Sequence, residues 1–225
     1  MQLRSFHVVS AMTLVLMFGL SAYAWIQLPP DAQVPVHWNL SGEIDGYASK
    51  ALALLFTPLL TAGLVALLSV VPRLDPRRAN LHRSSTAYQV MCSAIVVLML
   101  LIHAGLVLIA LGVPLDLTVV IGVGVGALLF VIGTQLSNTR SNWFMGVRTP
   151  WTLESDLSWR KTHRLAARLF MAVGLISAGA AVLGPSEVYF WVLMIGLLGS
   201  IAWIVGYSYL VWRDDPDRAA YPTAD

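Results

Sequence analysis

The chain has few charged residues and hardly any cysteine, and both shortages narrow the class of protein. Among its 225 residues, 12% are charged and 57% are hydrophobic, whereas soluble domains are about 25% charged and about 45–50% apolar. This composition excludes a disordered chain and an ordinary nucleic-acid-binding domain. Cys92 is the single cysteine, which excludes an intramolecular disulfide framework. With a mean hydropathy of +0.73, the composition indicates an integral membrane protein.

The sequence contains long apolar runs that are almost free of charged residues. A helix needs about 20 apolar residues to cross the core of a bilayer, and lipid requires each backbone group to be satisfied internally. The runs show no alternation in segments of about ten residues, as barrel strands would. We therefore predict an all-α, polytopic integral membrane protein. Its six transmembrane helices are expected at Phe6–Leu28, Ala51–Val71, Tyr88–Leu111, Leu115–Leu136, Leu165–Gly184 and Val188–Trp212.

The basic residues are distributed with a strong bias that predicts the orientation. Every lysine and arginine except Lys50 lies before the first run, after the second, around the fourth-to-fifth connection or after the sixth. Basic residues stay on the cytoplasmic side of a membrane protein, so we expect both termini to be cytoplasmic. The loops that carry acidic residues would then face outward. Those residues are Asp31, Glu43, Asp45, Asp116 and Glu187.

The first run has an alternative interpretation as a secretory signal peptide. Arg4 precedes it, and Ala22-Tyr23-Ala24 resembles a cleavage site with small residues. The apolar run is longer than the roughly 7–15 residues of a signal sequence, which favours an uncleaved helix. Cleavage would leave the sidedness of the remaining spans unchanged.

The first connection, residues 29–50, is polar and faces outward in this topology. Residues alternate between apolar and polar or proline over Val34–Asn39, a pattern typical of a short strand, and turn signals follow. We expect a small structured loop with Trp38 and Tyr47 near the lipid headgroups. His37, Glu43 and Asp45 would also suit a metal site. Their spacing matches no standard motif, so hydrogen bonding within the turn is the favoured interpretation.

The other long connection, residues 137–164, is basic and would be cytoplasmic. Thr149-Pro150 is expected to interrupt any helix. Thr152 or Ser155 can then cap a new helix, which would run from about Ser155 into the fifth span. On that helix Arg160, Arg164 and Arg168 recur every four residues, beside a stripe formed by Trp159 and His163.

This basic face permits two interpretations. It could anchor the protein at the membrane interface, with Trp143, Trp151 and Trp159 among the headgroups. Alternatively, it could dock a cytoplasmic protein or an anionic ligand. In that case Arg148, next to Asn142 and Thr149, would suit a phosphate or a carboxylate.

Within the predicted bundle the polar and small residues favour packing over chemistry. His103 lies inside the third run, where an ionisable residue suggests function but can also join helices through hydrogen bonds. Gly122 and Gly126 would let another helix of the same chain approach closely. No nucleotide-binding loop, zinc-binding helix or nucleophile elbow is present, and neither connection is long enough for a catalytic domain. We therefore expect no enzyme, cofactor or metal.

The two polar connections carry long motifs that resemble known families. The first motif resembles a bacterial membrane domain of uncharacterised role, and the second is similar to the SdpI family. The first consists of Pro35, His37, Trp38, Asn39, Gly42, Glu43, Asp45, Gly46, Tyr47, Ser49 and Lys50. The second consists of Asn142, Trp143, Gly146, Arg148, Thr149, Pro150, Trp151, Thr152, Trp159, Arg160, Lys161, Thr162, His163 and Arg164. The resemblance divides the chain into two membrane domains, residues 1–87 and 88–225.

The SdpI family is named for an immunity protein against a sporulation-delaying peptide. The resemblance implies a multi-pass protein of the bacterial cytoplasmic membrane, with the lipid bilayer as its surroundings and no direct nucleic-acid binding. It implies immunity to a secreted antimicrobial peptide, or sensing of it with capture of a cytoplasmic repressor of helix-turn-helix type. A small transporter or ion-coupled permease is the alternative, motivated by His103, Pro58 and the glycine-rich fourth span. An intramembrane enzyme using His37, Glu43 and Asp45 is a weaker one.

Overall fold

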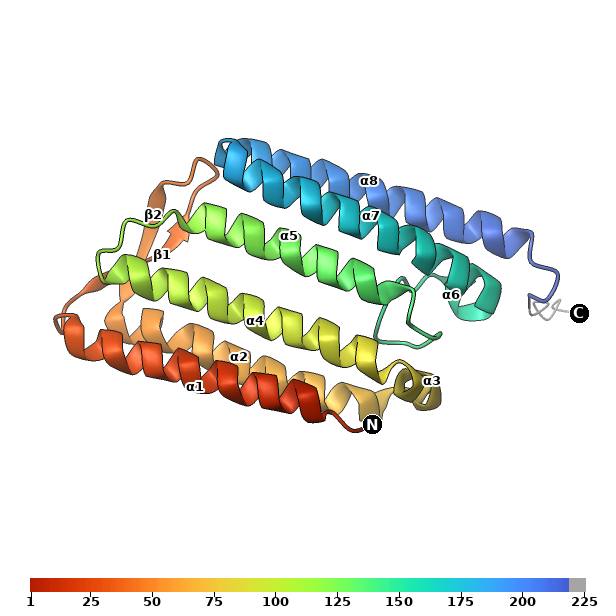
Figure 1. Cartoon of the computed structure of the whole chain (residues 1–225), viewed down its shortest axis with the longest axis horizontal. Helices are drawn as coiled ribbons and strands as arrows, with labels where there is room; N and C mark the ends of the chain where they lie inside the picture. The colour runs from red at the N-terminus through yellow and green to blue at the C-terminus, as the bar shows by residue number, and fades with distance from the viewer. Residues whose placement is uncertain (219–225) are drawn as a thin grey trace, which may run out of the picture.

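The computed structural model describes residues 1–218. Six long helices run side by side along the length of the molecule (Figure 1). Within the described residues, all six are long and apolar enough to cross a membrane, so the prediction of an all-α multi-pass membrane protein is confirmed. The long helices are α1 (Arg4–Gln27), α2 (Lys50–Leu74), α4 (Ser85–Ala110), α5 (Leu117–Leu136), α7 (Asp156–Leu183) and α8 (Ser186–Arg213). The short elements are β1 (Gln33–Trp38), β2 (Ile44–Ser49), α3 (Arg78–Arg83) and α6 (Pro150–Glu154).

The start of α7 follows the capping pattern in the sequence. The side chain of Ser155 accepts a hydrogen bond from the backbone N–H of Ser158, at 2.8 Å. This bond satisfies one of the free amides that every helix start leaves, and Asp156 adds a negative charge to the first turn. The helix therefore begins at Asp156, before the apolar run, and carries the polar residues 156–164 into the bundle.

The helices form a row with α4 and α5 in its middle. On one side α1 and α2 pack together, with α1 against α4, and on the other α7 packs against both α5 and α8 (Figure 1). The tight turn between α4 and α5 makes them the antiparallel hairpin that the sequence predicts. In the described part of the chain, α2 does not pack against α8. One face of the α4–α5 pair is therefore flanked, but not covered, by these two helices.

The contact between α5 and α7 is the closest helix pairing and depends on glycine. A Cβ atom on Gly126 would lie 2.5 Å from the carbonyl oxygen of Gly174, and one on Gly133 would lie 2.8 Å from that of Ala167. Both distances are too short for a side chain, so the two backbones are in direct contact. The small residues of the fourth span serve packing within the chain, as the sequence predicts.

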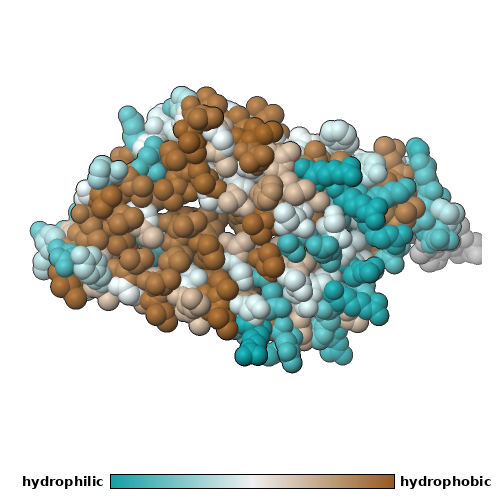
Figure 2. All heavy atoms as spheres, viewed as in Figure 1, coloured by the Kyte–Doolittle hydropathy of each residue, from teal (hydrophilic) through white to brown (hydrophobic). Residues whose placement is uncertain are grey.

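The two ends of the bundle differ in charge. The first end, which we name the hairpin end, carries β1, β2 and the α4–α5 and α7–α8 turns. The opposite end, the basic end, carries the start of α1, the α2–α4 connection, residues 137–155 and the end of α8. Figure 2 shows an apolar surface over much of the bundle and polar residues gathered toward the basic end. Lys50, at the hairpin end, is buried and donates to the carbonyls of Trp25 (3.1 Å) and Leu28 (2.9 Å).

Candidate functional site

The first motif, which we name the outer motif after its expected side of the membrane, folds as a β-hairpin whose turn is organised by Asn39. Strand β1 pairs with β2 in antiparallel register from Gln33 opposite Ser49 to Trp38 opposite Ile44, which confirms the strand pattern of the sequence. The side-chain oxygen of Asn39 accepts from the backbone N–H groups of Ser41 (3.0 Å) and Glu43 (2.9 Å). Its amide group donates to the Glu43 carboxylate at 3.0 Å. Asn39 and Glu43 therefore close the turn.

His37 and Asp45 meet across the hairpin but do not assemble the metal site that the sequence suggested. His37 Nδ1 lies 2.5 Å from Asp45 Oδ1, and both side chains are exposed. Glu43 is held by Asn39 instead. Among residues 1–218, no group of three or more His, Cys, Asp or Glu side chains is placed to hold a metal ion. His37, Glu43 and Asp45 therefore make hydrogen bonds within the hairpin.

The second motif, which we name the inner motif after its expected side of the membrane, starts within a compact segment, residues 137–149, which we name the motif loop. Asn142 is fully buried and folds it from within. Its side-chain oxygen accepts from the backbone N–H groups of Phe144 (2.9 Å) and Met145 (2.7 Å), and its amide donates to the carbonyls of Arg140 and Met145. These bonds occupy both the oxygen and the nitrogen of the Asn142 side chain. Asn142 is therefore not free to bind an anion, and an anion site at Arg148 stays a prediction without it.

Trp159 and His163 support the motif loop from α7. The two rings are stacked with centroids 4.0 Å apart, and both side chains are buried. The indole of Trp159 donates to the carbonyl of Thr139 at 3.0 Å. His163 Nδ1 donates to the carbonyl of Trp159 (2.8 Å), while Nε2 accepts from the backbone N–H of Val147 (2.9 Å). These partners require a neutral ring protonated on Nδ1.

This geometry corrects two further expectations. Trp159 is 2% exposed, so it is a buried support and does not anchor the protein among headgroups. Thr149-Pro150 begins a helix and does not only interrupt one. Proline at the first helical position loses no hydrogen bond. Thr149 caps α6 by accepting from the N–H of Thr152, whose hydroxyl accepts from the N–H of Thr149.

Residues from the α2–α4 connection hold the motif loop on its other side. Asp75 accepts from the backbone N–H groups of Arg77 (2.7 Å) and Trp143 (3.1 Å). Asn80 donates to the carbonyl of Ser141 at 2.9 Å, and the hydroxyl of Ser84 accepts from the N–H of Arg140 at 2.8 Å. Arg77 also donates to the Ser141 hydroxyl. Sequence reasoning missed these residues. The carboxylate of Asp75 in a short polar connection was the available signal.

The inner motif thus separates into a buried frame and an exposed basic face. The side chains of Asn142, Thr149, Thr152, Trp159, Thr162 and His163 are buried. Arg148, Arg160, Lys161 and Arg164 are exposed, and Arg148 also donates to the carbonyl of Trp143 at 2.6 Å. Trp143 and Pro150 of the motif are exposed as well, and the exposed side chains are the ones available to a partner. The burial pattern was not evident from the polar sequence.

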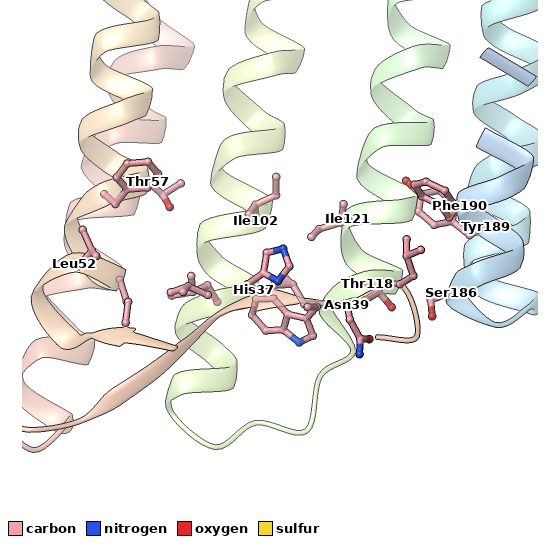
Figure 3. Close-up of a pocket in the computed structure, with 18 residues that line it drawn as sticks. His37, Asn39, Leu52, Thr57, Ile102, Thr118, Ile121, Ser186, Tyr189 and Phe190 are labelled. Atoms are coloured by element: carbon pink, nitrogen blue, oxygen red, sulfur yellow. The ribbon is translucent and has the colours of Figure 1, made fainter. Parts of the chain in front are cut away.

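An apolar cavity of about 600 Å³ lies beneath the outer motif. Helices α4 and α5 form its floor, α2 and α8 form its walls, and β1 crosses above it (Figure 3). Most of its lining is aliphatic or aromatic. His37, Asn39, Thr118 and Ser186 lie toward the hairpin end, and Thr57 lies farther from it (Figure 3). Among the lining residues are Trp38, Leu52, Phe56, Ile102, Ile121 and Phe190. We name it the outer cavity.

A second cavity, of about 330 Å³, lies beneath the motif loop at the other end, and we name it the inner cavity. Phe144 to Val147 cover it. On α4 it is lined by residues 88–95, and the outer cavity by Ile102 and Leu106. These positions recur at helical spacing, so both cavities lie along the same face of α4. Each motif therefore covers one end of a shared apolar face.

His103 lies in the third span and joins three helices. It is buried, with Nε2 3.0 Å from the hydroxyl of Ser21 and 3.2 Å from the carbonyl of Met17, both on α1. Ser21 in turn donates to the carbonyl of Leu54 on α2 at 2.7 Å. The interpretation of this histidine as a hydrogen-bonded link between helices agrees with the geometry.

Comparisons with known proteins agree with these motifs. Residues 138–209 match the model of the SdpI/YfhL protein family, and residues 12–62 match that of a domain of unknown function (DUF1648). The chain is 25% identical to the immunity protein SdpI of Bacillus subtilis (strain 168) over 174 residues, which cover 76% of this chain and 79% of that protein. No solved structure matches. The predicted resemblance to the SdpI family is therefore confirmed, with an SdpI/YfhL segment following the domain of unknown function.

Proposed function

We propose that this chain is a non-enzymatic protein of the bacterial cytoplasmic membrane that protects its cell from a secreted antimicrobial peptide. In this proposal the hairpin end faces outward and meets the peptide. The basic end faces the cytoplasm and holds a repressor until the peptide is sensed. The observation that carries the proposal is the placement of the two motifs at opposite ends of one helix bundle, each over its own cavity.

The orientation rests on the separation of charge between the ends. Lysines and arginines other than Lys50 lie at or near the basic end. Basic residues are retained in the cytoplasm when a membrane protein inserts. Both ends of the chain would then be cytoplasmic. The similarity to an immunity protein supports protection as the role.

The repressor would bind the exposed basic face of the inner motif. Arg160, Lys161 and Arg164 project from α7 beside the motif loop, and a partner with an acidic surface would complement them. The buried frame beneath would keep this face in place. The alternative of a small transporter stays a prediction, and the hydrogen bonds of His103 with α1 give it no specific support.

Deletion and charge reversal test the two roles separately. Loss of the gene should make cells more sensitive to the peptide, and the wild-type gene should restore resistance. The double variant R160E/R164E should keep resistance but release the repressor from the membrane fraction, because attraction to its acidic surface becomes repulsion. R73E, an exposed arginine outside the motif at the same end, is the matched control. Unchanged sensitivity on deletion would contradict the proposal, and unchanged fractionation in R160E/R164E would contradict the docking face.

A further inference from the structure

The outer cavity combines an open apolar side with an acidic rim. Leu52 and Phe56 on α2 line it while remaining 57% and 58% exposed. Because α2 does not pack against α8 in the described residues, the cavity opens sideways between these helices. Within a bilayer this opening faces the hydrocarbon, so an apolar chain can enter from the membrane.

A polar extension continues the cavity toward the hairpin end. A separate hollow of about 230 Å³ shares Thr118, Ser186 and Tyr189 with the outer cavity. It is also lined by Asp116 and Glu187. The Asp116 carboxylate caps α5 by accepting from the N–H groups of Thr118 (2.9 Å) and Val119 (3.4 Å). Two carboxylates therefore line a polar hollow that adjoins the apolar cavity through Thr118, Ser186 and Tyr189.

The rest of this end adds more negative charge. Glu43 and Asp45 lie on the hairpin above the cavity, and Asp45 is paired with His37. Lys50, the one lysine or arginine at this end, is directed into the backbone carbonyls of Trp25 and Leu28 at the C-terminal end of α1. Among the described residues, the rim thus has an excess of carboxylates. It would repel the phosphates of anionic lipids and attract ammonium or guanidinium groups.

We propose that the outer cavity binds an apolar peptide segment that carries lysine or arginine beside it. Apolar side chains of the segment fill the space between α2, α5 and α8, and its basic group binds at Asp116 and Glu187. This inference rests on the proposed function, since it names the chemical class of the peptide and where it binds. A lipid acyl chain would fit the apolar part but would leave the acidic rim without a partner.

The test uses the full-length protein in nanodiscs of phosphatidylcholine. The probe is a synthetic 20-residue peptide of leucine and lysine with one diazirine-bearing leucine at its centre, and light converts the bound probe into a covalent adduct. A peptide with glutamate in place of lysine is the charge control. We expect adducts on α2, α5 and α8 around the cavity, and at least tenfold fewer with the glutamate peptide.

Substitutions then locate the site. L52W fills the mouth of the cavity and should reduce the adducts at least fivefold. Leu59 lies on the same helix with nearly the same exposure, 59%, but lines neither the outer cavity nor the inner cavity, so L59W should label like wild type. E187Q removes one rim charge and should raise the probe concentration needed for half-maximal labelling severalfold. Equal elution profiles of all variants exclude misfolding.

Other outcomes overturn the site. Adducts spread evenly over lipid-facing helices, equal labelling by both peptides, or equal loss in L52W and L59W would each refute it. Peptide sensitivity of cells separates this failure from that of the proposed function. Cells protected as well by L52W as by wild type would refute the site alone. Localised labelling without protection by the wild-type gene would refute the immunity role and leave the site.

Discussion

At the residue scale, His163 connects more of the inner motif than any sequence pattern suggests. Its ring stacks on Trp159, donates to the backbone of α7 and accepts from the motif loop through Val147. Gly146, with φ +103°, lies so close that a Cβ atom there would collide with Nε2. Two motif residues that are separated in sequence are therefore fitted to each other.

Replacement of His163 by alanine should destabilise the protein by about 3 kcal/mol. The partly buried backbone N–H of Val147 would be left without its acceptor, and the stacking with Trp159 would be lost. Thermal unfolding in detergent, followed by near-ultraviolet circular dichroism, measures the change. K161A, exposed on the same helix, should stay within about 0.5 kcal/mol of wild type. A similar loss of stability in H163A and K161A would contradict this role for His163.

At the element scale, the sequence predicts the helices far better than the loops between them. Apolar runs locate six spans because hydrocarbon accepts little else, and Ser155 marks the start of α7. The hairpin strand was also predicted from alternation. The burial of Asn142 and Trp159 was not, because it depends on how the motif loop folds and on its contacts with α7 and the α2–α4 connection. A polar connection has the same sequence pattern whether a neighbouring element covers it or water does.

The α5–α7 contact should be intolerant of the smallest side chain. In G126A the methyl group would lie 2.5 Å from the carbonyl oxygen of Gly174, so the helices must separate. We expect a loss of about 2 kcal/mol or more, in the range for overpacked sites. G19A on α1, where nothing lies within 4 Å of the added atom, should be neutral or slightly stabilising because alanine favours helix. The melting temperature in detergent compares the two, and equal values would show that the contact is dispensable.

At the scale of the whole molecule, the connection between α2 and α4 holds the motif loop, which lies at the start of the segment that matches the SdpI/YfhL model. Asp75, Asn80 and Ser84 precede the predicted boundary at residue 87, and the backbone they bind belongs to the SdpI/YfhL segment or lies beside it. At the hairpin end, the walls of the outer cavity are not packed together. The division into two domains at residue 87 stays a prediction.

Loss of Asp75 should loosen this junction without unfolding the bundle. D75A leaves the backbone N–H groups of Arg77 and Trp143 without their acceptor. Local opening should therefore increase, and trypsin should cleave after Arg140 and Arg148 about tenfold faster. D214A, at the same end but outside the loop, serves as the comparison. Mass spectrometry of the early fragments gives the cleavage rates. Identical rates in D75A and D214A would show that Asp75 does not hold the motif loop in place.

The sideways opening of the outer cavity also determines how any occupant would arrive. A molecule that dissolves in the bilayer reaches the opening by diffusion in two dimensions, and its concentration there is set by partitioning from water. The lipids of the membrane compete for the same space, so apparent affinity would depend on the amount of lipid and on acyl-chain length. In detergent, ligands do not partition into a bilayer and lipids do not compete. Affinities measured there would therefore reflect only the contacts between ligand and cavity.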